Sequence, residues 1–192
     1  MSKSQECKTE AMLDAALDLF WRKGYKRCSM ADVVRKTGVA RYGLYQAFKD
    51  KDQLYCATLK RYHQRLRNRF IKPFSNTKSD YNVLIKHFDF ILDQLESGHI
   101  DGCYAHQAAI ERASQDENVK EIVNTIFEDT KSTYRAMISN GIEDGDIRDL
   151  PVEDLIIYVM GIQRAVIAMT KQNCSFEERQ SYVKCALTLL KP

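Results

Sequence analysis

The chain has 192 residues, of which 44% are hydrophobic and 29% are charged, and its formal net charge is +3. Such a chain is too apolar to be disordered and long enough for one sizeable core or two small ones. The longest purely apolar run, residues 155–160, is far shorter than the ~18 residues of a membrane span, and no signal-peptide core follows the polar N-terminus. These features exclude a membrane-spanning helix and predict a cytoplasmic globular protein.

The two parts of the chain carry opposite charge. Residues 1–72 hold 17 Lys and Arg against 7 Asp and Glu, whereas residues 73–192 hold 12 against 19. A basic segment of this size favours a polyanion, and the lack of an amphipathic stripe with exposed large apolar residues favours nucleic acid over lipid. The alternative is an ordinary solvated basic surface.

Cysteine and histidine spacing gives no metal signature. The chain has no C-x-x-C pair and no H-x₃-H or H-E-x-x-H motif. We therefore expect no metal, no cofactor and no disulfide framework, with most cysteines reduced and buried. The residues concerned are Cys7, Cys28, Cys56, Cys103, Cys174 and Cys185, and His63, His87, His99 and His106.

Helical periodicity predicts three short helices before a long one, in an all-α chain. The first has an apolar face and ends at Gly24, with the face formed by Leu13, Ala16, Leu17 and Phe20. Ser29 and Asp32 form a capping box that opens a second helix, which ends at Gly38. The third helix covers residues 41–48, and a box of Asp50 and Gln53 starts the fourth, at about 51–72. The second and third have the dimensions of a helix-turn-helix.

The rest of the chain is also expected to be helical. Pro73 and the polar stretch 75–80 mark a boundary, and 97–103 is expected to be a loop. Helices are predicted at 81–96 (buried), 104–114, 118–142 (amphipathic), 152–172 and 176–190. We expect about nine helices in all. The predicted division is a helix-turn-helix domain at 1–51, a connecting helix at 51–72, and a larger helical domain at 73–192.

The third helix offers donors on its outer face. Recognition of DNA needs side chains that reach base edges and others that contact phosphates on either side. Arg41 can reach guanine or phosphate, Gln46 can read adenine, and Tyr42 can contact a thymine methyl or a phosphate. The Tyr45 hydroxyl and Lys49 are candidates for the backbone. Leu44 and Phe48 are expected in the core.

Two further residues lie at helix starts that favour an anion, namely Lys51 in the fourth helix and Ser29 in the second. Each candidate also has an ordinary structural explanation. Tyr45 can be a half-buried packing residue, and Lys49 and Lys51 can be solvated charges.

Residues 12–59 resemble the N-terminal domain of the tetracycline-repressor (TetR/AcrR) family of bacterial transcription regulators. The matches are AAxxLFxxKGY, SMxDV, GV, LYxxF and KxxL, in order and spacing. The resemblance implies DNA binding by the third helix, homodimerisation through the last two helices, and an effector pocket in the C-terminal domain. Alanine at residue 40 departs from the serine or threonine common in the family, so we expect no side-chain cap and no phosphate contact from this position. Tyr42 is also bulkier than the residue often found there.

The expected function is therefore that of a homodimeric repressor, released from a palindromic double-stranded DNA operator by a small-molecule effector. Pocket candidates are aromatic and polar residues on the core helices: Tyr62, Cys103, His106, Phe127, Tyr134, Tyr158 and Arg164. Alternatively, the aromatic residues are simply core and Arg164 is paired across the dimer interface. We expect a cytoplasmic protein that is nucleoid-associated when bound to DNA, and no catalytic residues.

Other functions stay open at this point. Cys103 lies near a predicted helix start with His106 one turn on, which suits a thiol-based redox or electrophile sensor, and an inert buried cysteine is the alternative. The same pair as nucleophile and base would make a helical enzyme, but no third orienting residue has a suggestive spacing. A non-specific architectural DNA-binding protein would bind without operator preference. Activation, in place of repression, depends on operator position.

Overall fold

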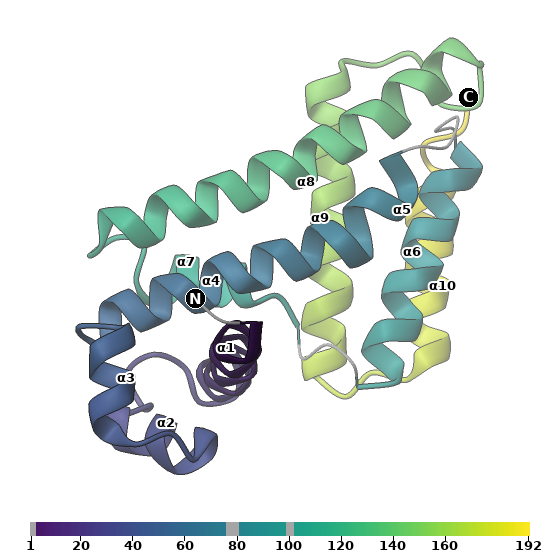
Figure 1. Cartoon of the computed structure of the whole chain (residues 1–192). Helices are drawn as coiled ribbons and strands as arrows, with labels where there is room; N and C mark the ends of the chain where they lie inside the picture. The colour runs from purple at the N-terminus through teal and green to yellow at the C-terminus, as the bar shows by residue number, and fades with distance from the viewer. Residues whose placement is uncertain (1–2, 76–80, 99–101) are drawn as a thin grey trace. The chain divides into compact units, whose positions relative to one another are not determined.

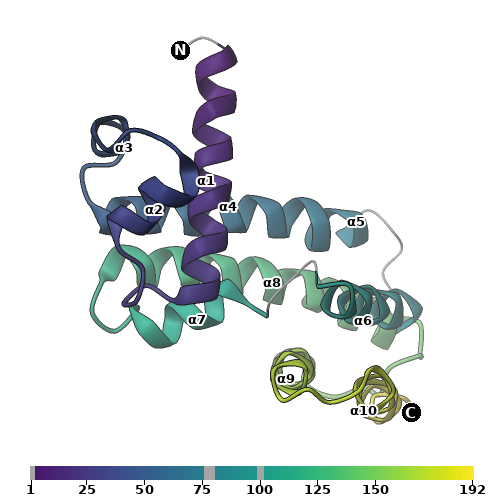
Figure 2. The ribbon, with the colours of Figure 1, turned by 90° about the horizontal axis from the view of Figure 1, so that it is seen from below.

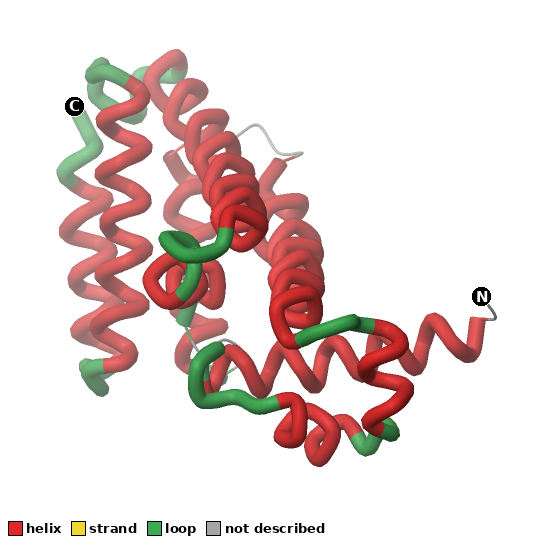
Figure 3. The backbone as a smooth tube through the Cα atoms, turned by 90° about the vertical axis from the view of Figure 1, so that its left-hand side faces the viewer, coloured by secondary structure: helices red, strands yellow, loops and turns green. Residues whose placement is uncertain are grey.

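The computed structural model describes residues 3–75, 81–98 and 102–192. Within these ranges the backbone is helical and contains no strand (Figure 1 and Figure 3). Counting α4, η1 and α5 as one helical segment, the described part holds nine helices, which confirms the predicted all-α fold. Most of the polar stretch 75–80 and the centre of the loop 97–103, including His99, lie outside the described residues.

Packing divides the chain into two compact units. Unit 1 comprises Met1–Leu66 and Tyr104–Ile126, and unit 2 comprises Arg67–Cys103 and Phe127–Pro192. The long helix α8 therefore contributes residues to both units. The predicted domains were continuous segments of the chain, with a boundary near residue 72. In the structure, α7 (Tyr104–Glu111) and the first part of α8 group with the N-terminal helices. The contacts of Tyr104, Glu111 and Arg112 described below are the physical reason.

Unit 1 contains the predicted helix-turn-helix. Its helices are α1 (Lys3–Lys23), α2 (Met30–Thr37), α3 (Arg41–Ala47), α4 (Lys51–Leu66), α7 (Tyr104–Glu111) and the start of α8 (Glu117–Glu143). Helix α1 packs against α2 and α4 and buries a helical stripe of Met12, Ala16, Leu17 and Phe20, while Leu13 is only partly buried. Leu44 is fully buried as predicted, but Phe48 is only half-buried because α3 ends one residue before it.

The fourth helix differs from the prediction. It was expected as one helix to residue 72, but α4 ends at Leu66 and is followed by a π-helix, η1 (Arg67–Ile71), and by α5 (Lys72–Ser75), which includes Pro73. Proline lacks the N–H that would bond to residue 69, and its ring clashes with that carbonyl in a regular α-helix. A wider π turn over residue 69 relieves this clash.

Unit 2 holds a core of aliphatic and aromatic side chains. It contains α6 (Tyr81–Glu96), the second part of α8, α9 (Val152–Lys171) and α10 (Phe176–Thr188). Helices α9 and α10 lie side by side (Figure 2), and both pack against α6. From the second part of α8, Tyr134, Met137 and Ile138 are fully buried in this core. None of the described helices is long and apolar enough to cross a membrane.

Candidate nucleic-acid interface

The start of α2 is fixed by a complete capping box. The hydroxyl of Ser29 accepts a hydrogen bond from the N–H of Asp32 at 3.1 Å, and the Asp32 carboxylate accepts one from the N–H of Ser29 at 2.9 Å. Hydrogen bonds from the Ser29 side chain and backbone hold the pKa of Asp32 at about 2. Ser29 is exposed, but in the free protein its hydroxyl is already engaged with the helix end.

The turn between α2 and α3 is made by Gly38, which has φ +67° and donates its N–H to the carbonyl of Val34 at 2.9 Å. Helix α3 then starts after Ala40, which makes no side-chain cap. This agrees with the expectation drawn from the alanine. The single buried side chain of α3 is Leu44, so this short helix is held mainly by one apolar contact and by its flanking turns.

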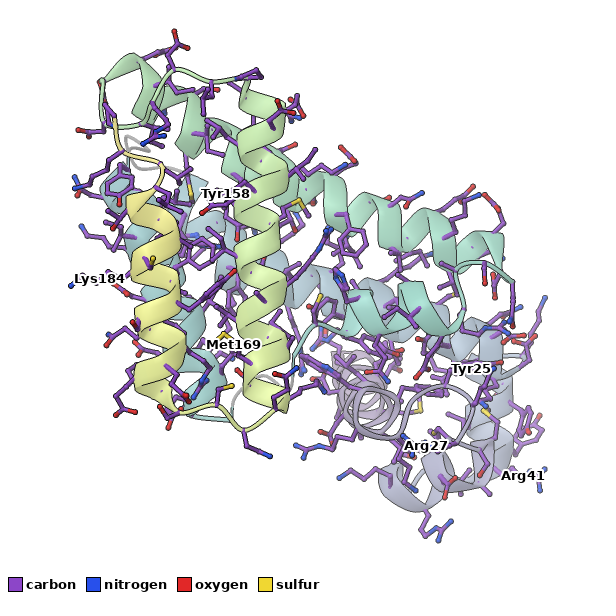
Figure 4. All side chains as sticks on the ribbon, turned by 180° about the vertical axis from the view of Figure 1, so that it is seen from behind. Tyr25, Arg27, Arg41, Tyr158, Met169 and Lys184 are labelled. Carbon is purple, nitrogen blue, oxygen red and sulfur yellow. The ribbon has the colours of Figure 1, made fainter. Side chains whose placement is uncertain are left out.

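The predicted reading face of α3 is exposed. Arg41, Tyr42, Tyr45, Gln46 and Lys49 all lie at the surface, and the Arg41 side chain extends from the start of the helix (Figure 4). Tyr42 is 79% exposed and Tyr45 is 38% exposed. The Arg41 guanidinium lies 5.6 Å from the centre of the Tyr45 ring. Arg41 and Lys49 are both exposed, so these cations can be reached by a ligand.

The Lys51 side chain packs over an aromatic ring and is not simply a solvated charge. Its Nζ lies 4.0 Å from the centre of the Tyr25 ring, and the Arg112 guanidinium lies 4.3 Å from the same ring. The Tyr25 hydroxyl donates to Asp52, and Arg112 pairs with Asp52 at 3.1 Å. Burial and the neighbouring carboxylate of Asp52 raise the pKa of Tyr25 to about 12. The tyrosine thus stays a neutral hydrogen-bond donor.

Helix α7 reaches this cluster from a distant part of the sequence. Glu111 accepts a hydrogen bond from the N–H of Tyr25 at 2.7 Å and another from Gln107 at 3.2 Å. Arg112 also pairs with Asp116 at 3.0 Å. Tyr25 can be recognised in the sequence because it belongs to the KGY motif. The sequence gives no signal that Glu111 and Arg112 lie beside it.

The predicted effector residues are spread over both units. Tyr62 and His106 belong to unit 1, and Cys103, Phe127, Tyr134, Tyr158 and Arg164 belong to unit 2. Tyr62 packs in an aromatic cluster of unit 1, with ring centres 5.2 Å from Trp21 and 5.7 Å from Tyr104. Its ring is thus part of the core of unit 1.

Within unit 2 the candidates have different surroundings. Tyr158 donates its hydroxyl to the carbonyl of Ala186 at 3.0 Å and so points from α9 toward α10 (Figure 4). Arg164 is exposed and Phe127 is half-buried. Tyr134 is fully buried and contacts two residues that sequence reasoning did not select, His87 at 3.3 Å and Gln163 at 3.0 Å.

The cysteines are more accessible than expected. Of the free cysteines that the structure describes, Cys28 is buried, Cys185 is exposed, and Cys56, Cys103 and Cys174 are intermediate. The expectation that most are buried is therefore wrong. Cys103 directly precedes α7, and both it and His106 are half-buried. Within the described ranges, no group of three or more His, Cys, Asp or Glu residues has the arrangement of a metal site.

The N-terminal part of the chain is similar in sequence to known regulatory proteins. Residues 12–58 match the model of the bacterial regulatory proteins of the tetR family. The transcriptional repressor ComR of Escherichia coli K12 is 35% identical over 97 residues, which are 50% of this chain and 46% of ComR. The match thus spans about half of that relative.

Two solved structures share the fold over nearly the whole chain. A TetR-family regulator from Agrobacterium tumefaciens has a TM-score of 0.86 at 17% identity, and the match covers 97% of this chain and 99% of that one. The regulator FadR from Bacillus subtilis, solved with stearoyl-CoA, has a TM-score of 0.75 at 17% identity, with 94% and 96% covered. The segment 12–58 is thus similar to the bacterial regulatory proteins of the tetR family, and the chain shares its all-α fold with these solved structures.

Proposed function

We propose that the protein is a homodimeric transcriptional repressor that binds a palindromic operator through α3 and is released by a small-molecule effector. The observation that carries the proposal is the outer face of α3. Donor-bearing side chains, namely Arg41, Tyr42, Gln46 and Lys49, are exposed there while Leu44 anchors the opposite face. This is the arrangement that readout of a major groove needs. The related ComR is named a transcriptional repressor, which supports the sign of regulation.

Contacts to the DNA backbone would flank this face. Tyr45 offers a hydroxyl, and Lys51 and Ser29 lie at the starts of α4 and α2, where helix dipoles favour phosphate. The net balance of +10 over residues 1–72 adds a general attraction to DNA. Such a protein would act in the bacterial cytoplasm, on nucleoid DNA.

Exposed apolar residues on α9, on α10 and directly after α10 support the dimer. Ile157 and Leu189 are 67% and 60% exposed, and Tyr158 and Tyr182 are each 37% exposed. Large apolar side chains gathered on two packed helices suit an isologous four-helix interface with a second copy. A two-fold dimer would present two copies of α3, and binding would require them about one helical turn of DNA apart, ~34–36 Å.

The effector would act by changing this spacing. Helix α4 runs from the DNA-binding helices to η1, where unit 2 begins, so a ligand bound in unit 2 can act on it. Phe127, Tyr134, Tyr158, Arg164 and Cys103 are the proposed contributors, and Tyr134 has the best support because it is buried beside other polar groups. A preference of ~1–3 kcal/mol between two states changes affinity by 5- to 150-fold.

The test is selection of binding sites from a random DNA pool, followed by affinity measurement at fixed salt. We expect a palindrome bound at least ~10³-fold more tightly than scrambled DNA. Tyr42→Ala and Gln46→Ala should lose this preference, whereas Gln64→Ala, on an exposed position of α4, should keep it. Equal affinity for palindrome and scrambled DNA would instead identify a non-specific DNA-binding protein.

A further inference from the structure

His87 is a buried histidine with one ring nitrogen that meets no donor. It lies on α6 in the core of unit 2 and is only 4% exposed. Its Nδ1 has no hydrogen-bond partner among the described residues. Burial lowers the pKa of His87 to about 4, so the ring is neutral near pH 7. One nitrogen therefore carries a proton and the other carries a lone pair.

The neighbours of His87 determine which nitrogen carries the proton. The hydroxyl of Tyr134 donates its single proton to Oε1 of Gln163 at 3.0 Å. The same hydroxyl oxygen lies 3.3 Å from Nε2 of His87 and can only accept in that contact. Nε2 is therefore protonated, and Nδ1 presents its lone pair to the core. A buried acceptor without a donor is rare in folded proteins and calls for an explanation.

Aromatic rings pack around the imidazole of His87. The centre of the His87 ring lies 4.7 Å from Phe74, 5.4 Å from Tyr134 and 6.1 Å from Phe88. Phe88 and Tyr134 are themselves stacked, with centres 6.2 Å apart. Burial is the one cause that shifts the pKa of His87, so no charged group acts strongly on it. These surroundings suit an uncharged ring and disfavour an ion.

One of the aromatic side chains next to His87 comes from a segment that includes a π-helix. Phe74 lies in α5, directly after the π-helix η1, and η1 also carries Phe70, whose ring centre is 5.2 Å from that of Phe90. Turns of π-helix are uncommon and frequently occur at functional sites. Phe74 is only partly buried, and its ring centre lies 4.7 Å from that of His87, so a ligand that displaces this side chain would approach the imidazole.

We propose that unit 2 binds an uncharged aromatic compound with a hydroxyl group, which donates a hydrogen bond to Nδ1 of His87 and packs against the ring of Phe74. This rests on the proposed effector-released repressor, because it assigns the chemistry of the effector. Gln163 and Tyr134 are positioning residues in this site. They fix the histidine tautomer and so make Nδ1 an acceptor that selects for a donor.

The test compares two probes that differ in a single donor, phenol and its methyl ether anisole. Calorimetric titration of the full-length protein should show phenol binding roughly tenfold more tightly than anisole, the worth of about one hydrogen bond. His87→Phe should bind both probes equally. Tyr81→Phe removes a hydroxyl from another buried tyrosine of the same core and should keep the preference.

A second measurement needs no variant and so holds even if His87→Phe does not fold. The ¹⁵N resonance of His87 Nδ1 in the wild-type protein should be of the unprotonated type and should shift when phenol is added, but not when anisole is added. A protonated Nδ1, equal affinity for the two probes, or binding of neither would overturn the proposal. Binding of neither would mean that buried water alone meets the lone pair.

The DNA assay separates this inference from the proposed function. If phenol binds with the expected preference and weakens operator binding in wild type but not in His87→Phe, both stand. Preferential phenol binding without any change in operator affinity supports the site and contradicts effector release through it. Failure to select any operator contradicts the repressor, while the phenol and anisole comparison still decides the site.

Discussion

The carboxylate of Glu111 accepts a hydrogen bond of 2.7 Å from the backbone N–H of Tyr25, a residue 86 positions earlier in the chain. This bond ties the end of α7 to the turn that follows α1. The approach is close, because a β-carbon added at Gly24 would lie 2.6 Å from Oε1 of Glu111. The turn that begins the helix-turn-helix is thus held by a residue outside it.

Gly24→Ala should destabilise the protein by about 1–3 kcal/mol, because the residue has φ +78° and its new methyl group would meet Glu111. Urea unfolding measures the loss. Gly38→Ala is the matched control, since Gly38 has φ +67° but no atom within 4 Å of an added β-carbon. Gly38→Ala should cost less, and equal losses in the two variants would mean that the Glu111 contact contributes nothing.

Helix capping differs between the two helices of the helix-turn-helix. Ser29→Ala should cost about 1 kcal/mol of unfolding free energy, because it removes the cap of α2. Ala40→Ser should gain up to about 1 kcal/mol, because α3 has no side-chain cap. Ser132→Ala, at an exposed position inside α8, serves as the control and should change stability little. A loss of stability in Ala40→Ser would show that serine cannot cap α3.

Lys49→Ala should reduce the salt dependence of operator binding. If this exposed side chain neutralises a phosphate, the slope of log K against log salt falls by about 0.9. Lys60→Ala removes the same charge from an exposed position on α4 and should leave the slope nearly unchanged. Fluorescence anisotropy at several salt concentrations measures both. The same slope change in both variants would indicate a general charge effect without a defined phosphate contact.

Ile157→Glu should dissociate the dimer. A charge at this exposed position of α9 would be buried without a partner in the proposed interface, which should raise the dissociation constant at least ~10-fold, or by about 1.4 kcal/mol. Ile110→Glu, on α7, is the matched control because Ile110 is even more exposed, at 80% against 67%. Sedimentation velocity at several concentrations distinguishes the two. A wild-type monomer at micromolar concentration would contradict the dimer itself.

Acidification from pH 7 to pH 5 should destabilise unit 2 through His87. The pKa of this buried histidine is lowered from 6.5 to about 4, so between these values the unfolded chain binds a proton that the folded chain excludes. Stability therefore falls with decreasing pH, by about 2 kcal/mol at pH 5. Urea unfolding at both values measures the change.

His87→Phe should lose this pH dependence, whereas His63→Phe on α4 should keep most of it. The carboxylates of Asp14, Asp18 and Asp32 have pKa values lowered below 3.8 in the folded protein. Their contribution is therefore lost mainly below about pH 4. An unchanged slope in His87→Phe would assign the acid sensitivity to another group.

The sequence by itself determined the elements whose signals are local. The capping box of Ser29 and Asp32, the glycine turns at 24 and 38, and the buried Leu44 all depend on residues within one helical turn of each other. Caps, turns and periodicity act over three or four residues, so they can be recognised without a tertiary structure. The outer face of α3 follows from the same periodicity, and its exposed side chains are the predicted ones.

Only the tertiary structure decided which distant residues meet. The sequence contains no signal that Glu111 lies against Tyr25, that Tyr62 belongs to the aromatic core of unit 1, or that His87 lacks a donor at Nδ1. Each of these depends on contacts between residues more than 40 positions apart, or on the lack of one. Such contacts form when whole helices pack against each other. They produce no periodic pattern within a short stretch of sequence, so the sequence alone does not predict them.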